Sequence, residues 1–561
     1  MLRIARTTLR ASQFPRTQGV RYASRTAPKL GRRIVLASGG AALGLAGLWA
    51  STIHADSVAA VSFSATSKPN RDESAIRSSF GTLVRTYVVY TMCSIPALVD
   101  NSPWLLKTLS SIPGINWIAE RVVRATFFDQ AFCSFVGGDS AAETLPLLHN
   151  LRSANTGALF AYSVEVDEDE AMAASGSKSS QHNPHKAIVD EMLHCIDVAA
   201  DFEDGLVAKQ TGRRTWVAVK ITALLPDASA LIRLSSHIIS IRPPTLPPQV
   251  AFPGNPTSSD LDILYAPKPP NEILSDADLE MLRDLHADLE LICTRAQARG
   301  VRIIVDAEYS WYQPALDALT LALMRRFNAL QPEANGATQP LVYATFQAYL
   351  RRTPAHLVHA LRDAKKHKYA LGVKLVRGAY HTHETAAHKA RTLGKTTLSI
   401  SPDALPPVWE VKADTDASYD ACAGLLLDAV AADATRGQPQ AIGVLFGTHN
   451  WASCKKVLAG LKERGLAVLM PDSKLRVAER VGERVTFGQL YGMCENLTQY
   501  LANQTESSSP IVIKYVPYGA LTEVMPYLSR RAIENKSVLG GGAAQAERKR
   551  AWDAIWQRIF G

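Results

Sequence analysis

The chain has 561 residues, of which 47% are hydrophobic and 20% charged, and its formal net charge is +9. Residues 1–33 hold nine of the 61 basic residues and no acid, which leaves 52 basic against 52 acidic side chains elsewhere. An electrically neutral body excludes the broad attraction to phosphates on which nonspecific nucleic-acid binding depends. The seven cysteines include no CxxC pair, which favours free thiols in a reducing compartment.

The N-terminal 33 residues resemble a mitochondrial transit peptide, because arginines recur among Ser, Thr and Ala and no acid precedes Asp56. Residues 34–53 follow as 20 uncharged residues, which is about the length of a membrane span. Gly40 and Gly44 give this segment a small-xxx-small face. Two interpretations stay open: the segment spans a membrane, or it belongs to a longer presequence.

Residues 71–138 are predicted to form a mainly helical region, and residues 139–545 a single large α/β domain. In that domain, short apolar runs alternate with amphipathic helical patterns. The eight runs are Ala158–Val166, Thr215–Leu224, Arg302–Glu308, Leu341–Gln347, Leu371–Ala379, Ala441–Asn450, Arg484–Tyr491 and Ile511–Gly519. The clearest helices are Ser275–Arg299, Pro314–Asn328, Pro354–Lys366, Tyr419–Ala432 and Ala452–Arg464.

Eight strands alternating with helices predict a (βα)8 barrel of the TIM type. An open, doubly wound sheet is the alternative, but the chain has no GxGxxG after a strand and no GxxxxGK[ST]. Residues 167–186, which are acidic and then Ser/His-rich, and the Pro-rich residues 242–270 are interpreted as inserted surface loops.

Residues 546–561 are predicted to form a C-terminal amphipathic helix with Trp552, Ile555, Trp556, Ile559 and Phe560 on one side. Docking of this helix on the barrel is the first interpretation, and an interfacial membrane helix is the second.

Polar or aromatic side chains stand at the ends of seven consecutive predicted strands. They are Lys220, Asp306 with Glu308, Gln347, Lys374 with Arg377 and Tyr380, Thr448 to Asn450, Gln489 to Tyr491, and Tyr515. Because the carboxyl ends of the strands carry the active site of a parallel barrel, these groups are expected to meet at one mouth.

The last strand runs into a helix, within residues 511–535, that carries Tyr527, Arg530, Arg531 and Glu534 on one face. Two adjacent arginines beside a tyrosine suit a small carboxylate, because the guanidinium fork matches the carboxylate geometry.

The remaining residues suit a larger, anionic and partly flat ligand. Gly378 and Ala379 after Arg377 allow the backbone to come close to a phosphate or a ring. Thr448, His449 and Asn450 open a helix, whose first N–H groups can receive a pyrophosphate.

Three motifs in this order resemble those of the proline dehydrogenase family, in its eukaryotic, mitochondrial branch: VKLVRGAY at 373–380, GTHN at 447–450 and YVPYGALTEVMPYLSRRAIEN at 515–535. The likeness covers about residues 131–539, without the insertions. It implies a barrel that holds FAD noncovalently and oxidises L-proline to Δ1-pyrroline-5-carboxylate by hydride transfer from C5 to flavin N5. It also implies a place as the first step of proline catabolism, with a membrane quinone as electron acceptor.

The resemblance assigns roles to particular residues. FAD would be contacted by Gln347, Arg377, Gly378, Ala379, Thr448, His449, Asn450 and Glu534. The proline carboxylate would be held by Lys220, Arg530 and Arg531, and the ring pocket shaped by Tyr515, Tyr527 and Leu490. Asp306 and Lys374 would lie close to the reacting centre and the flavin.

Two details of the resemblance stay open. Bacterial relatives carry Arg and Lys where this chain has Lys374 and Arg377, so it is undecided which cation lies near flavin N5 and which near a phosphate. Relatives that use hydroxyproline have a smaller residue at the position of Tyr515.

Other functions are weighed against this one. His383, Glu384 and His388 form H-E-x-x-x-H, not the HExxH of zinc peptidases, and no metal is expected. Paired-carboxylate hydrolysis by Asp306 and Glu308 is a weak alternative. Another flavin barrel, such as a folate reductase, and a membrane-tethered scaffold without catalysis remain as alternatives.

The expected location is the mitochondrion, at the inner membrane or on its matrix side. If residues 34–53 span the membrane, the basic flank before them predicts an N-terminus in the matrix and a barrel outside it, which disagrees with the family expectation.

Overall fold

The computed structural model describes the barrel and most of its helices. The described residues are 87, 91, 136–163, 184–206, 212–242, 252–266, 273–330, 340–396, 398–435, 441–520, 523–524, 527–528 and 543–560. All of them belong to the second of two units into which the chain divides, residues 1–72 and 73–561. The predictions for residues 1–53, for most of 71–138, for 167–183 and for Arg530, Arg531 and Glu534 lie outside the described residues.

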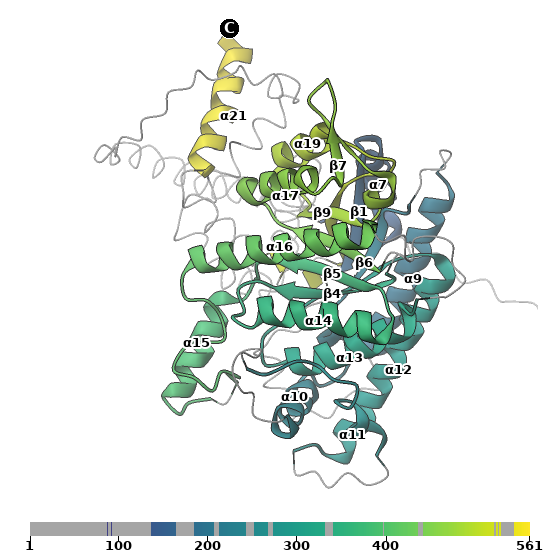
Figure 1. The fold of residues 1–561 in the computed structure, drawn as a ribbon, viewed down its shortest axis with the longest axis vertical. Coiled ribbons are helices and arrows are strands. Elements are labelled where there is room, and N and C mark those ends of the chain that lie inside the picture. Colours follow the sequence, from purple (N-terminus) through teal and green to yellow (C-terminus); the bar gives the residue numbers. More distant parts are fainter. Residues whose placement is uncertain are drawn as a thin grey trace, which may run out of the picture. The chain divides into compact units, whose positions relative to one another are not determined.

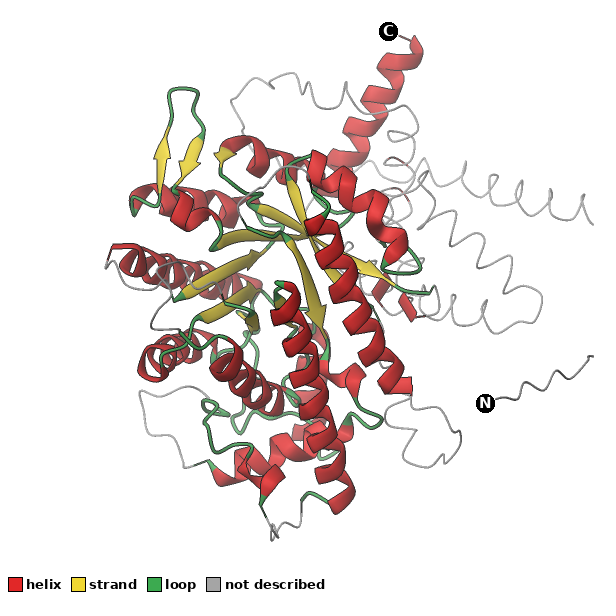
Figure 2. Ribbon diagram, turned by 90° about the vertical axis from the view of Figure 1, so that its right-hand side faces the viewer, coloured by secondary structure: helices red, strands yellow, loops and turns green. Residues whose placement is uncertain are grey.

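Eight parallel strands close into a barrel in the order β1-β11-β9-β6-β5-β4-β3-β2. Their bounds are β1 Thr156–Tyr162, β2 Thr215–Val219, β3 Ile303–Val305, β4 Val342–Gln347, β5 Leu371–Val376, β6 Ile442–Gly447, β9 Val485–Leu490 and β11 Val512–Tyr518. The first and last strands pair from Thr156↔Val512 to Tyr162↔Tyr518. The barrel prediction is therefore confirmed, and the open sheet is wrong. Figure 2 shows the strands at the centre with helices around them.

Helices connect successive strands and cover the barrel (Figure 1). The longer ones are α7 Leu145–Ser153, α9 Pro184–Asp204, α10 Ser229–Ile241, α12 Asp276–Arg299, α13 Gln313–Phe327, α14 Thr353–His367, α15 His381–Thr392, α16 Lys412–Thr435, α17 Trp451–Glu463, α19 Glu495–Gln504 and α21 Ala543–Phe560. Short helical turns are η2 Ala142–Thr144, η4 Ile221–Leu224, α11 Asp262–Tyr265 and α18 Glu479–Gly482. Among the described residues, no helix combines the length and the hydropathy that crossing a bilayer requires.

The predicted start of α12 is confirmed in detail. The Ser275 hydroxyl accepts a hydrogen bond from the Asp278 N–H at 3.2 Å, and the Asp278 carboxylate accepts one from the Ser275 N–H at 3.0 Å. This reciprocal pair satisfies backbone donors that the first helical turn leaves without partners. Gly300, at φ 66°, ends the helix.

The strands separate two apolar layers because successive side chains point to opposite faces. Leu159, Ala161, Trp216 and Ala218 lie in a cluster that fills the barrel interior, whereas Phe160 packs in the layer under the helices. The interior is thus a packed core, and a site can form only where this packing stops, at the ends of the strands.

Two parts differ from the sequence predictions. Residues 252–266, within the predicted Pro-rich surface loop 242–270, are packed: Leu264 is fully buried and Asp260 forms a buried ion pair with Arg242 at 2.7 Å. This part is therefore not exposed throughout, although residues 252–261 contain no helix or strand. A small sheet of β7 Ala467–Leu469, β8 Leu475–Val477 and β10 Thr505–Glu506 was not predicted, because two or three residues are too few for a periodic pattern.

Candidate functional site

Three side chains from distant parts of the chain meet inside the carboxyl end of the barrel. Lys374 Nζ on β5 lies 2.5 Å from Asp306 Oδ1, just after β3. The Tyr515 hydroxyl on β11 donates to Asp306 Oδ2 at 3.0 Å. The Lys374 ammonium also lies 5.1 Å from the centroid of the Tyr515 ring. The structure therefore brings together three of the residues singled out in the sequence.

The two charged groups of this cluster, the Lys374 ammonium and the Asp306 carboxylate, hold each other in place. Lys374 and Asp306 are only 12% and 11% exposed, so each charge depends on the other for compensation. Both carboxylate oxygens of Asp306 accept hydrogen bonds, one from Lys374 and one from Tyr515. This geometry suits Asp306 for holding the ammonium and the ring in place rather than for removing a proton.

Glu308 belongs to a separate network beside Lys220. Its carboxylate accepts hydrogen bonds from the N–H of Thr222 at 3.1 Å and from the Thr222 hydroxyl at 2.5 Å. Its backbone carbonyl accepts from the Gln347 side chain at 2.9 Å. Burial raises the pKa of Glu308, while Thr222 and the charge of Lys220 act in the opposite direction. Asp306 and Glu308 therefore have different hydrogen-bond partners.

Arg377 lies outside the barrel interior. It is surrounded by Asp416, Tyr419, Thr448 and Ser453, which together we call the slot of Arg377. Its guanidinium donates to Asp416 at 2.6 Å, to Thr448 Oγ1 at 2.8 Å and to Ser453 Oγ at 2.9 Å. It also lies 4.3 Å above the centroid of the Tyr419 ring. These partners come from α16, α17 and the end of β6, so the plane of the guanidinium is fixed from several sides.

Asp416 and Tyr419 were not identified in the sequence. Asp416 precedes the start predicted for its helix, which begins at Lys412 rather than at Tyr419. Partial burial would raise the pKa of Asp416, but hydrogen bonds from Lys412 and Arg377 lower it below its usual value. The signal that the sequence contained was an Asp and a Tyr three positions apart, which is one helical face.

The GTHN motif joins three elements. Thr448 Oγ1 accepts from the Asn450 N–H at 3.0 Å, and the Asn450 side chain caps α17 by accepting from the Ser453 N–H at 3.1 Å. The Leu490 N–H, at the end of β9, donates to His449 Nε2 at 3.1 Å. The motif therefore links the end of β6 to the end of β9 and to the start of α17.

Gly378 occupies a position that only glycine fits. Its φ is 119°, and a Cβ there would lie 2.5 Å from the buried ring of Tyr349. The backbone after Arg377 can therefore turn tightly over that ring, while Ala379 remains exposed.

Aromatic rings line the neighbouring edge of the mouth. The Tyr309 ring stacks on Trp311 at 4.5 Å, with 7° between the planes, and lies 4.2 Å from the ring of Tyr380. Tyr309 was missed in the sequence because it follows the strand-end acids by one position. Tyr527, by contrast, was predicted and is 2% exposed.

The histidines of α15 have separate partners. His381 contacts the Trp409 carbonyl at 2.8 Å, and His388 contacts Ser399 at 3.0 Å. Glu384 accepts from the N–H and the hydroxyl of Ser310 at 2.6 and 2.5 Å. Within the described part of the chain, no three or more His, Cys, Asp or Glu are grouped so that they could hold a metal ion.

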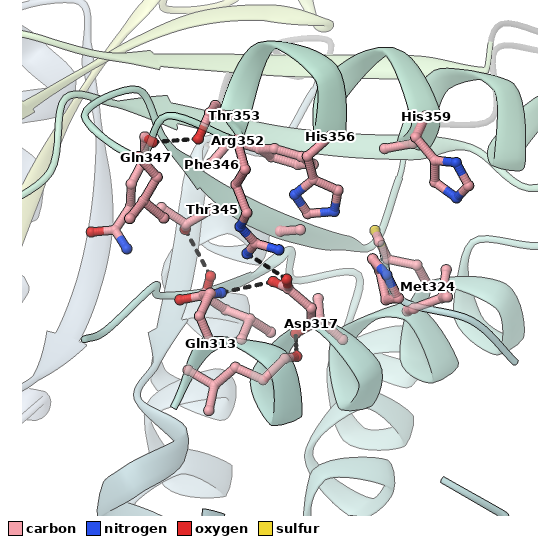
Figure 3. A pocket seen from close by; sticks show the side chains of 18 of the residues that line it. Gln313, Asp317, Met324, Thr345, Phe346, Gln347, Arg352, Thr353, His356 and His359 are labelled. Carbon is pink, nitrogen blue, oxygen red and sulfur yellow. Dashed lines mark hydrogen bonds and ion pairs between the residues drawn. The ribbon is translucent and has the colours of Figure 1, made fainter. Parts of the chain in front are cut away.

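A small cavity of about 40 Å³ lies between β4 and the helices α13 and α14 (Figure 3). Arg352 and Asp317 point toward each other there and form an ion pair at 2.5 Å. Burial and the nearby Arg352 lower the pKa of His356 to about 3. This volume holds one or two water molecules, so the cavity is part of the packing behind the strands and not a pocket for an organic ligand.

A closed parallel barrel with clustered cations, an acid and aromatic rings at its carboxyl end is the architecture of a (βα)8-barrel enzyme. The family model described as "Proline dehydrogenase" matches residues 149–541. The chain therefore belongs to the proline dehydrogenase family and is an oxidoreductase that acts on proline.

Curated relatives agree with this assignment. Hydroxyproline dehydrogenase of Rattus norvegicus is 29% identical, over 85% of this chain and 91% of its own length, and that of Mus musculus is 30% identical over the same shares. Proline dehydrogenase 1, mitochondrial, of Drosophila melanogaster is 27% identical over 82% of this chain and 76% of its own. The last of these names agrees with the mitochondrial address predicted from residues 1–33.

Among solved structures, proline utilization A (PutA) from Bdellovibrio bacteriovorus, inactivated by N-propargylglycine, is 19% identical with a TM-score of 0.49. The match covers 83% of this chain and 38% of that protein.

Proposed function

We propose that the protein is a mitochondrial, FAD-dependent enzyme that oxidises L-proline to Δ1-pyrroline-5-carboxylate and passes the electrons to a quinone of the inner membrane. The observation that carries the proposal is the Asp306–Lys374–Tyr515 cluster at the barrel mouth, in a chain of the proline dehydrogenase family. The cluster places the fixed positive charge of Lys374 and the aromatic ring of Tyr515 where the substrate would be oxidised.

The donors beyond the cluster fit FAD. Arg377 is held by the end of β6 and by α17, next to the capped helix start at Asn450 and the tight turn at Gly378. A fixed cation, hydroxyl groups and a helix N-terminus are the groups that favour a pyrophosphate. Gln347, Arg377, Gly378, Ala379, Thr448, His449 and Asn450 would hold the cofactor, together with Glu534 outside the described residues.

The positions of Lys374 and Arg377 indicate which of the two cations lies near which end of the cofactor. Lys374 points into the barrel toward Asp306 and Tyr515, whereas Arg377 lies against α16 and α17. We therefore assign Lys374 to the reacting end of the cofactor and Arg377 to its phosphates. When bound, FAD supplies the acceptor for the hydride, with its two electrons, that leaves C5 of proline.

The chain orients the substrate for this reaction. Lys220, Arg530 and Arg531 hold the carboxylate, while Tyr515, Tyr527 and Leu490 enclose the ring. The amine nitrogen must be neutral, because its lone pair forms the C5=N bond as the hydride leaves, and the displaced proton passes to solvent. Lys374, fixed by Asp306, stabilises the negative charge that accumulates beside it.

The direct test is an anaerobic titration of the purified protein with L-proline while the flavin spectrum is recorded. The proposal requires a bound flavin that bleaches in proportion to the proline added. A protein without flavin would support the scaffold alternative, and bleaching by NAD(P)H but not by proline would support another flavin barrel.

The slot around Arg377 yields a prediction on cofactor affinity. Replacing Tyr419 by Leu should raise the dissociation constant for FAD by roughly 2- to 30-fold, the range of one cation–π contact. The measurement is titration of the flavin-free protein with FAD, which does not depend on turnover. Phe327→Leu is the control. It removes a similar contact with Arg326 at the C-terminal end of α13 and should leave the dissociation constant for FAD unchanged. Unchanged FAD affinity in the Tyr419 variant would contradict the role of the slot.

The second candidate substrate is hydroxyproline, which is favoured by the names of the rat and mouse relatives. Tyr515 favours proline instead. Its hydroxyl donates to Asp306 and its ring lies beside the Lys374 ammonium, so in the proposed site a 4-hydroxyl group would be crowded by this side chain.

We predict that kcat/KM for proline exceeds that for 4-hydroxyproline by about 100-fold, because the site offers the extra hydroxyl no room. Tyr515→Ser should lower the ratio of kcat/KM for proline to kcat/KM for 4-hydroxyproline, mainly by raising the turnover of 4-hydroxyproline. Tyr265→Ser, at an exposed tyrosine of α11, serves as the control. Comparable turnover of the two substrates by the unchanged protein would refute the prediction.

A further inference from the structure

Helix α21, Ala543–Phe560, carries a continuous row of exposed aromatic rings. Trp552, Trp556 and Phe560 follow one another every four residues, with ring centroids 6.0 and 4.4 Å apart. They are 44%, 53% and 67% exposed, and Ile559 beside them is 54% exposed. We call these four residues the aromatic strip.

The strip is not the face with which α21 packs on its own protein. Ala551 and Ile555, which are one turn apart on another face, are 3% and 8% exposed. At the edge between the two faces, the Trp552 ring meets the ring of Tyr87 at 5.1 Å. The helix thus has an intramolecular contact already, and a second, adjacent apolar face remains in solvent. Docking on the barrel was predicted for five residues as one set, Trp552, Ile555, Trp556, Ile559 and Phe560. Of these five, only Ile555 is buried.

The charge around the strip is positive. Residues 543–560 hold four basic side chains, Arg548, Lys549, Arg550 and Arg558, against Glu547 and Asp553. Lys549 lies three residues before Trp552 and is exposed, so it shares the edge of the strip. Trp, Phe and Ile beside Lys and Arg are the composition of helices that lie in the surface of an anionic bilayer.

We propose that the aromatic strip is a contact surface for anionic phospholipid, with α21 lying in the plane of the bilayer surface. Tryptophan rings favour the depth of the headgroups, and the long basic side chains can extend from there to the lipid phosphates. A second copy of the chain is a poorer occupant, because a two-fold contact through this face would bring the basic residues of both copies together. The proposal rests on the proposed function in one respect: it supplies the membrane contact that a membrane-dissolved electron acceptor requires.

The test uses the full chain, with vesicles of phosphatidylcholine alone or mixed with phosphatidylglycerol. Hydrogen–deuterium exchange is followed by mass spectrometry, because it reports on residues 543–560 separately from any binding through residues 34–53. We expect several-fold slower exchange in 543–560 with the anionic vesicles, and loss of this protection in the triple variant Trp552→Ser, Trp556→Ser, Phe560→Ser. The variant Tyr265→Ser, which removes an aromatic ring that is 60% exposed on α11, should keep it.

Three results would overturn the proposal: no slowing in 543–560 with either vesicle, equal slowing by neutral and anionic vesicles, or a concentration-dependent slowing without lipid, which would indicate a second copy. Exchange in the barrel strands, unchanged in the triple variant, verifies that it folds. The proline titration on the same preparations separates the two proposals. Flavin bleaching without protection of α21 rejects only the membrane contact, and protection without bleaching rejects only the enzymatic function.

Discussion

Replacing Asp306 by alanine should slow the reduction of bound flavin by proline by about 100- to 1,000-fold, the usual effect of losing one preorganised electrostatic contact. The same change should lower the free energy of unfolding by about 3–5 kcal/mol, because it leaves the Lys374 ammonium without its partner in a largely buried site. Two effects of one substitution are expected because Asp306 holds both Lys374 and the hydroxyl of Tyr515.

A second substitution separates the two effects. In the double variant Asp306→Ala, Lys374→Met no unpaired charge remains, so most of the lost stability should return. The flavin should still be reduced slowly, because the cation that stabilises the developing charge is gone. Stopped-flow absorbance measures the reduction, and denaturant unfolding measures the stability.

Asp472→Ala is the matched control, since this aspartate pairs with Lys474 in a solvent-exposed turn. Asp472→Ala should change neither the rate of flavin reduction nor the free energy of unfolding. An Asp306→Ala protein that is reduced at the normal rate would show that the central cluster serves the fold alone.

The barrel could be predicted from the sequence because its strands are encoded locally. Each is a run of β-branched and apolar residues followed by polar ones. Seven of the eight runs contain the whole observed strand, and the run Ala158–Val166 overlaps β1, which begins two residues earlier. The capped start of α12 is local in the same sense, since Ser275 and Asp278 lie three positions apart. Alternation along a strand also explains why Lys374 points into the barrel, where it meets Asp306.

The slot of Arg377 could not be predicted, because its partners are set by packing. Asp416 and Tyr419 are about 40 residues away in the chain, and they reach Arg377 only because α16 lies beside β5 and β6. An arginine at position 377 is understandable in these terms. A guanidinium can donate to Asp416, Thr448 and Ser453 at once and lie flat on Tyr419, which a lysine ammonium cannot do.

The small sheet and the packed part of the Pro-rich segment were missed for a different reason. Strands of two or three residues have no recognisable period. Residues 252–266 are held by long-range contacts, among them the buried ion pair between Asp260 and Arg242 and the burial of Leu264. A pairing of this kind depends on residues that come together only in the folded chain, and composition alone suggested a loop.

The second large effect is expected at the carboxylate clamp. Arg531→Met should raise KM for proline by about 10- to 100-fold, since a charge-assisted hydrogen bond contributes roughly 1.5–3 kcal/mol. The turnover number should fall less than kcat/KM, because the lost contact holds the substrate in the ground state as well as in the transition state.

Arg531→Lys keeps the charge but loses the two-pronged geometry, so an intermediate KM is expected if the clamp is bidentate. Steady-state kinetics with a quinone analogue give KM, and the flavin absorbance per chain verifies that the cofactor stays bound. Arg476→Met is the control, because its ion pair with Glu506 on the small sheet is about half exposed on both sides. A normal KM in Arg531→Met with full flavin content would remove Arg531 from the substrate site. The positive charge that orients proline would then have to come from Lys220 and Arg530 alone.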